Sequence, residues 1–256
     1  MSTIFVSLLC VASLGLGIFG AHEGGRFLGA RYLRTHPSGL PEGSSAAQGK
    51  VFTTFGLVMA FALAGAAQRF ETRRLLITEE ANAIDTSYRR LDLLPTDAQP
   101  ALRELFRSYA EVRADLYADD GRHYAERERE TAEIQDEIWT LAVAGAGHAS
   151  LAPAANTLLL GALNNMFDIT TTRHATRMSH PPAVIFVMLG LLGMLAAVLV
   201  GFSSAESAHR SWLHSIVFCA VIAIMGYVVI DLEFPRLGLI RVDAADTTLV
   251  ELRAEM

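Results

Sequence analysis

The sequence predicts an all-α polytopic membrane protein, with four transmembrane helices and a helical bundle domain inserted between the second and the third. Four apolar stretches contain no Asp, Glu, Lys or Arg: Thr3–Ala21, Val51–Gln68, Ala183–Ala205 and Ser211–Ile230. Each is close to the roughly 20 residues that an α-helix needs to cross a bilayer. Because backbone polar groups in lipid must be satisfied within the segment, each stretch is expected to be helical. The polar residues are concentrated between the second and third stretches, in a segment of domain size.

Residues 1–68 are expected to form the first transmembrane hairpin, joined by a loop rich in Gly and Pro. The first stretch could instead be a secretory signal. However, Met1–Thr3 carries no Lys or Arg, and a cut after Ala21 would place the bulky Phe19 at a position that favours small residues. We therefore expect a retained helix that spans the membrane.

Residues 69–182 are expected to form a soluble helical bundle continuous with the second span. No Gly or Pro occurs from Arg69 to Leu94, and Pro95 is expected to end this extended helix. Its apolar residues recur every three or four positions, at Ile77, Ala81, Ile84, Tyr88 and Leu91. Similar stripes predict three further helices before Met178. Acidic residues outnumber basic ones in this segment, which argues against a nucleic-acid surface.

Residues 183–230 are expected to form the second transmembrane hairpin, and residues 231–256 a C-terminal interfacial tail. The apolar residues Leu237, Leu239 and Ile240 could keep the tail in the interface or dock it on the bundle. Asp231 and Arg236 mark the membrane exit, where Arg236 could pair with Asp231 or contact lipid phosphate. An even number of spans puts the N-terminus, the bundle and the tail on one side. Arginines near the membrane on that side favour a cytoplasmic bundle in a bacterial inner membrane.

The second span carries the candidate pore-lining residues Phe52, Phe55, Met59 and Ala62, which fall on one helical face. Aromatic rings on such a face can constrict an ion path. The alternative is that the phenylalanines face lipid or the first span.

Small residues follow one another at intervals of four in both spans of the first hairpin. The second span carries Gly56, Ala60 and Ala64, and the first carries Ser13, Gly17, Ala21 and, just beyond it, Gly25. Such ladders let helices approach closely, either between subunits or within one chain.

A polar network is expected in the helical bundle. Its candidates on the extended helix are Glu79, Asn82, Asp85 and Arg89, and on the later helices Arg113, Asn164, Asp168 and Arg173. Asp85 and Arg89 are spaced for an i,i+4 ion pair. We favour a structural salt-bridge network, because fully paired buried polar groups more often specify structure; a mechanical link to the second span is the alternative.

Several function classes lack their characteristic residues. No acid or base other than His214 lies within a span, which argues against an ion-coupled transporter. The sequence has no nucleophile elbow, P-loop or dinucleotide motif, and its histidine spacings match no metal site. We therefore expect neither an enzyme nor a bound cofactor or metal.

Four segments resemble a bacterial family described as bestrophin-like. They are Glu79–Pro95, Arg103–Arg113 with Tyr109, Leu163–Asp168 with Arg173 after it, and Asp231–Gly238. The resemblance covers nearly the whole chain and implies two spans, a helical domain and two further spans. It also implies a distant kinship with bestrophins, pentameric anion channels whose second span lines a hydrophobic neck.

Two hypotheses for function follow. The first is an oligomeric membrane channel for small ions, with the second span nearest the pore and homo-oligomer formation in the lipid bilayer. The second is a non-transporting sensor or scaffold whose helical domain binds a partner. The oligomeric state distinguishes them, because four spans without a polar face cannot enclose an aqueous pore alone.

Overall fold

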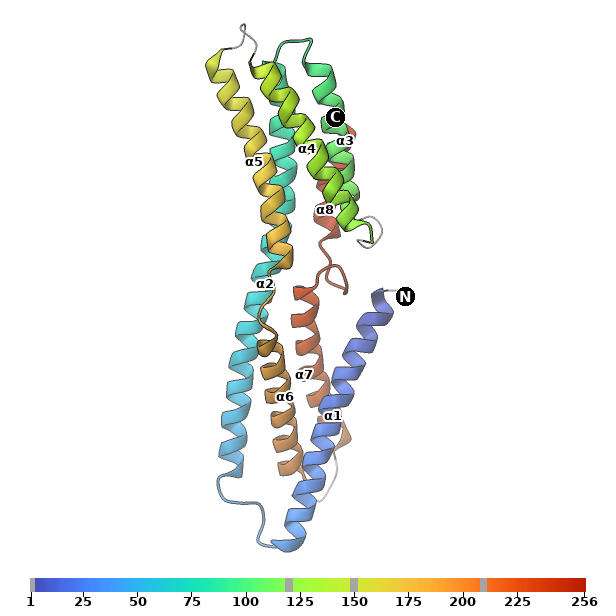
Figure 1. Cartoon of the computed structure of the whole chain (residues 1–256). Helices are drawn as coiled ribbons and strands as arrows, with labels where there is room; N and C mark the ends of the chain where they lie inside the picture. Colours follow the sequence, from blue (N-terminus) through green and yellow to red (C-terminus); the bar gives the residue numbers. More distant parts are fainter. Residues whose placement is uncertain (1–2, 118–121, 148–151, 208–210) are drawn as a thin grey trace. The chain divides into compact units, whose positions relative to one another are not determined.

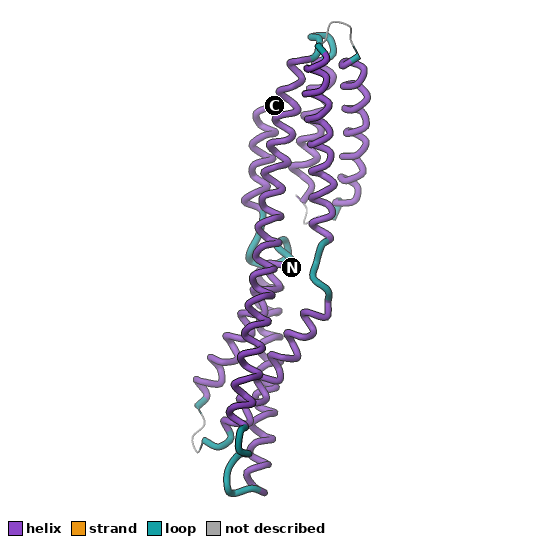
Figure 2. Tube along the Cα trace, turned by 90° about the vertical axis from the view of Figure 1, so that its left-hand side faces the viewer, coloured by secondary structure: helices purple, strands orange, loops and turns teal. Residues whose placement is uncertain are grey.

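The computed structural model describes residues 3–117, 122–147, 152–207 and 211–256. Within these ranges the chain forms eight α-helices and two short 3₁₀ helices, and no strand (Figure 2). The α-helices are α1 (Thr3–Thr35), α2 (Ser44–Arg90), α3 (Gln99–Ala114), α4 (Tyr124–Ala146), α5 (Pro153–Met178), α6 (Ala183–Ser204), α7 (Trp212–Glu233) and α8 (Asp243–Glu255). The 3₁₀ helices, Leu91–Leu93 and Asp115–Tyr117, directly follow α2 and α3. The predicted all-α class is confirmed.

Among the described residues, four helical segments are long and apolar enough to cross a membrane. They are Phe5–Thr35, Ser44–Leu93, Pro153–Ser204 and Trp212–Glu233. The chain is therefore a membrane protein whose spanning helices contact lipid. α2 runs without a break from Ser44 to Arg90, well beyond the apolar stretch that ends at Gln68.

The chain divides into two compact units (Figure 1). We call Met1–Phe70 together with His180–Arg241 the membrane unit. We call Glu71–Ser179 together with Val242–Met256 the helical domain. The first part of α2 belongs to the membrane unit, and the remainder of α2 belongs to the helical domain.

In the membrane unit, α1 packs along α6 and, over a shorter length, against α7. Glycines make the contact between α1 and α6 possible. A Cβ atom on Gly25 would overlap the carbonyl oxygen of Val198, and one on Gly201 would overlap the carbonyl oxygen of His22. The two backbones thus meet directly, as small residues allow in membrane helices.

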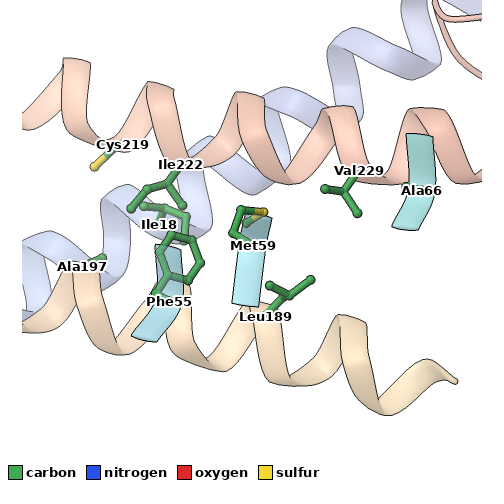
Figure 3. Packing of buried hydrophobic residues seen from close by; sticks show 9 residues of the cluster. All are labelled: Ile18, Phe55, Met59, Ala66, Leu189, Ala197, Cys219, Ile222 and Val229. Atoms are coloured by element: carbon green, nitrogen blue, oxygen red, sulfur yellow. The ribbon is translucent and has the colours of Figure 1, made fainter. Parts of the chain in front are cut away.

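The core of the membrane unit is an apolar cluster to which all four of its long helices contribute (Figure 3). Its buried members are Ile18, Phe55, Met59, Ala66, Leu189, Ala197, Cys219, Ile222 and Val229. These side chains fill the space between the helices and leave the outer surfaces of α1, α2, α6 and α7 for lipid or for another chain.

The helical domain has a separate core. In it α3 packs against α4 and α8, and α4 packs against α5. The predicted stripe of α2 supplies buried side chains such as Ile77, Ile84 and Leu91, and α3 supplies Leu102 and Phe106. Burial of apolar stripes of this kind is the main stabilising contribution to such a bundle.

The C-terminal segment differs from the predicted interfacial tail. Residues 231–241 belong to the membrane unit, but Asp243–Glu255 forms α8, which packs on α3 of the helical domain. The reason is an apolar stripe: Leu249 and Leu252 are buried, and Arg253 pairs with Glu111 of α3 at 2.8 Å. The prediction of a tail lying at the membrane surface was wrong for this helix.

Candidate functional site

The predicted pore-lining face of α2 is turned largely toward the interior of the chain. Phe55 and Met59 are each only 3% exposed and belong to the apolar cluster (Figure 3). Room for the Phe55 ring is provided by Gly193 of α6, because a Cβ there would lie 3.4 Å from the Phe55 Cε2 atom. The assignment of Phe55 and Met59 to a pore surface is therefore corrected: they are core residues.

The other two predicted pore residues lie at the border of this core. The Phe52 side chain is 44% exposed, and its ring centroid lies 6.4 Å from that of Phe55 and 6.1 Å from that of Phe218. Ala62 is half-buried and packs against the apolar cluster. Neither residue lies at the centre of an exposed face.

The predicted small-residue ladders do not pair with each other. Contacts of α1 within the described chain are made with α6 and α7, and Ser13 and Gly17 are exposed, with Ala21 half-buried. The alternative in which this ladder packs on α2 within one chain is therefore contradicted. The physical reason is that Gly25 and Gly201 let the backbones of α1 and α6 pack directly against each other.

The ladder of α2 is consequently left on the surface. Thr53, Gly56, Ala60 and Ala64 are exposed, and a Cβ on Gly56 would meet no described heavy atom within 4 Å. The spacings of three and four residues place them on one side of the helix. We call these four residues the outward face of α2.

At one end of the membrane unit, a buried carboxylate joins three segments of the chain. Glu233, at the end of α7, is fully buried and accepts hydrogen bonds from Arg69 Nε at 2.8 Å and from Arg69 Nη2 at 2.7 Å. Its other oxygen lies 3.0 Å from His180 Nδ1, and the His180 ring stacks on Phe234. This cluster holds together the end of α7, the end of the spanning part of α2 and the segment before α6.

The predicted exit residue Asp231 shapes the turn after α7. Its carboxylate accepts hydrogen bonds from the backbone N–H groups of Leu239, at 3.0 Å, and Ile240, at 2.9 Å. Gly238 is required at this turn because a Cβ there would overlap the Asp231 carboxylate. Arg236 is half-buried in the same turn.

The buried polar network of the helical domain is centred on Glu80. Its carboxylate is 0% exposed, lies 2.5 Å from Arg113 Nε and also pairs with Arg173. Burial alone would raise the pKa of Glu80, but the two guanidinium groups outweigh it and hold the pKa below the usual 4.5. Burial alone would lower the pKa of Arg113, but the negative charge of Glu80 outweighs this effect and raises the pKa of the guanidinium.

A neutral network adjoins these ions. The hydroxyl of Tyr109, a fully buried residue, lies 3.0 Å from Thr170 Oγ1 and accepts a hydrogen bond from Gln135 Nε2 at 3.1 Å. Burial raises the pKa of Tyr109. The hydroxyl therefore stays protonated and links α3, α4 and α5.

Only part of the predicted network belongs to this cluster. Arg113 and Arg173 take part in it. Asp85 pairs with Arg89 at 2.8 Å, but the Arg89 side chain is 72% exposed, so this is a surface pair of adjacent helical turns. The remaining candidates, Glu79, Asn82, Asn164 and Asp168, are all exposed. Their assignment to a buried network was wrong.

The sequence contained a signal for Glu80 that the spacing argument missed. Glu80 lies three residues after Ile77 and four before Ile84, and Arg113 lies four after Tyr109 and three before Leu116. Opposite charges that interrupt two apolar stripes are candidates for a buried ion pair. Asp85, in contrast, lies at the edge of its stripe.

None of these clusters resembles a catalytic centre or a metal site. Within the described ranges, no group of three His, Cys, Asp or Glu residues is arranged to hold a metal ion. The chemistry that the site residues supply is charge pairing, close helix packing and an exposed small-residue face.

A sequence model of the bestrophin-like domain matches residues 50–247. The chain belongs to the bestrophin-like family. The match begins before the spanning part of α2 and extends into α8, so it includes the outward face, the Glu80 network and the Glu233 cluster of this bestrophin-like protein.

Crystal structures of variants of a bacterial bestrophin homologue from Klebsiella pneumoniae share the fold. One has a TM-score of 0.72 and 14% identity, covering 97% of this chain and 99% of that chain. A second has a TM-score of 0.73 and 14% identity, with coverages of 97% and 98%. A third has a TM-score of 0.67 and 15% identity, with coverages of 99% and 100%. Among curated proteins, none matches the bestrophin-like chain.

Proposed function

We propose that this bestrophin-like protein assembles into a homo-oligomeric ion channel in which the outward face of α2 lines a shared pore. The observation that carries the proposal is that face itself. Thr53, Gly56, Ala60 and Ala64 are exposed in the spanning part of α2, whereas Phe55 and Met59 of the same helix are in the core. Leu57, which is 56% exposed, is the bulky side chain on the same side. Small residues let several copies of a helix approach one axis without closing the path between them.

Packing within the single chain supports a pore between copies. The interior of the membrane unit is filled by apolar side chains, among them Phe55, Met59 and Ile222. Ions cannot cross such an interior, because a charge transferred into an apolar medium loses its hydration. A continuous aqueous path therefore requires surfaces contributed by several chains.

The proposal extends to the ions and to the orientation. Small anions are the expected ions, since the resemblance to bestrophins implies anion channels and the outward face carries no acid that would attract cations. Arg69, Arg73 and Arg74 follow the spanning part of α2 and favour a cytoplasmic helical domain at the bacterial inner membrane. The proposal assigns no catalytic activity.

Planar-bilayer recording of the purified full chain tests this function. We expect an oligomer in mild detergent and, after reconstitution, discrete current steps whose reversal potential in a KCl gradient lies toward that of chloride. A monodisperse monomer that gives no current above that of protein-free bilayers would contradict the channel.

One observation favours the second candidate, a scaffold that binds a partner. A polar groove with a volume of about 480 Å³ lies between α2 and α5 of the helical domain, lined by residues that include Asn82, Thr86, Arg90 and Asn165. A partner helix could occupy it. The same preparation separates the two candidates, because a scaffold needs neither an oligomer nor a current.

A further inference from the structure

A second groove lies within the membrane unit, between α2 and α6. It has a volume of about 340 Å³. Its wall on α2 includes Phe61, Ala62 and Gly65, and its wall on α6 includes Ile185 and Leu189. Apart from its Arg69 end, the lining is apolar, so water gains no hydrogen bonds there.

The groove has the length of one leaflet. Its lining on α2 runs from Val58 to Arg69, which at 1.5 Å rise per residue corresponds to about 16 Å. Half of the hydrocarbon core of a bilayer is about 15 Å. Arg69 and Pro181 lie at the end where α2 leaves the membrane unit and α6 begins, and Val58 and Leu189 lie toward the bilayer centre.

The charged end of the groove is held in place. Arg69 Nε and Nη2 bind the buried Glu233, whose other oxygen lies close to His180 Nδ1. The absence of a side chain at Gly65 lets the guanidinium reach back over the groove, because a Cβ there would lie only 3.2 Å from Arg69 Nη1. The Nη1 side of the fixed Arg69 guanidinium thus faces the end of the apolar groove.

We infer that this groove binds one acyl chain of an anionic phospholipid, with the lipid phosphate at Arg69. An empty apolar groove in hydrocarbon loses packing contacts that a flexible acyl chain can supply. The Arg69 guanidinium can donate charge-assisted hydrogen bonds to phosphate from Nη1, while its Nε and Nη2 pair with Glu233. At this end of the membrane unit the three arginines outnumber the two carboxylates (Arg69, Arg236 and Arg241 against Asp231 and Glu233), and an excess of positive charge attracts anionic lipid. This lipid site lies on the side of α2 opposite to the outward face, and it does not depend on ion conduction.

Native mass spectrometry of the full chain tests the lipid site. The protein is reconstituted with equal amounts of phosphatidylglycerol and phosphatidylcholine carrying the same acyl chains, and then released into detergent. We expect one phosphatidylglycerol per chain to be retained, about fivefold in preference to phosphatidylcholine. Equal retention of both lipids, or of neither, would overturn the inference.

A matched pair of substitutions on α6 locates the site. Ile185→Trp fills the groove, whereas Val184→Trp adds the same ring at a side chain that is 67% exposed on the adjacent position. We expect Ile185→Trp to lose the retained phosphatidylglycerol and Val184→Trp to keep it. Retention by both variants would overturn the inference. The inference would also be overturned if the wild type retained no lipid and Ile185→Trp no longer formed the oligomer. A second copy of the chain would then cover the groove.

The lipid preference is measured on the wild-type chain alone. It therefore decides the inference even if Ile185→Trp does not fold. Retained lipid from a chain that passes no current would support the lipid site while contradicting the channel, so the two proposals fail separately.

Discussion

Glu80→Gln is expected to destabilise the helical domain by about 3–5 kcal/mol. The substitution keeps the shape of the side chain but removes its charge, and so leaves the guanidinium groups of Arg113 and Arg173 without their counter-ion. The Arg113 side chain is only 1% exposed, so water cannot replace the lost carboxylate. Thermal unfolding of the purified protein in detergent, followed by the loss of helical circular dichroism, measures the effect.

The surface pair provides the matched control for this substitution. Asp85→Asn makes the same chemical change four residues from Arg89, whose side chain is 72% exposed. Exposed pairs contribute between 0 and about 1 kcal/mol, so we expect almost no change. A Glu80→Gln protein as stable as Asp85→Asn would show that the buried network does not stabilise the domain.

The pH dependence provides an independent readout of Glu80. Its pKa in the folded protein lies below the usual 4.5, so the folded state binds fewer protons than the unfolded state near that pH. The stabilising contribution is therefore complete above pH 4.5 and is lost as the pH falls through the lower, folded pKa. We expect the stability difference between wild type and Glu80→Gln to shrink over that acidic range.

Gly25→Ala is expected to cost about 3 kcal/mol, through overpacking at the contact between α1 and α6. The added Cβ would overlap the carbonyl oxygen of Val198, which is backbone and cannot rotate away as a side chain could. Gly201→Ala should have a similar effect, because its Cβ would overlap the backbone of His22. The helices would have to separate, and packing over the whole contact would weaken.

Two other glycines on the same two helices serve as controls for this contact. Gly24 lies beside Gly25 on α1, and Gly190 lies on α6, and a Cβ at either would meet no described atom within 4 Å. Alanine at these positions should leave the melting temperature unchanged or slightly raised, since alanine favours the helix. If all four alanine variants have the same melting temperature, the close approach of α1 and α6 is not a determinant of the fold.

The spanning helices could be predicted from the sequence because uncharged apolar stretches of that length have few alternatives. The direction that each helix faces could not be predicted in the same way. The spanning part of α2 is apolar on all sides, so hydrophobicity does not distinguish the side of Phe55 and Met59 from the side of Ala60. Only the packing against α6 and α7 determines it.

The close helix contact was missed for a related reason. Small residues occur at helical spacing in α1, α2 and α6, and spacing alone does not say which two ladders meet. The structure pairs Gly25 of α1 with α6, and leaves Gly56 of α2 exposed. Glu80 was not predicted because the expected polar face ran through Glu79, Asn82 and Asp85. Glu80 instead lies with Ile77 and Ile84 on the buried side of α2.

Modification of single cysteines on α2 tests the central claim, that its outward face lines a pore. In a Cys10→Ser, Cys219→Ser background, Ala60→Cys lies on the outward face, Phe55→Cys lies in the core and Val187→Cys lies on an exposed face of α6. During bilayer recording a charged methanethiosulfonate is added. We predict that most of the current is lost for Ala60→Cys and that the current is unchanged for the other two. Unchanged current for Ala60→Cys together with block at Phe55→Cys or Val187→Cys would contradict the account.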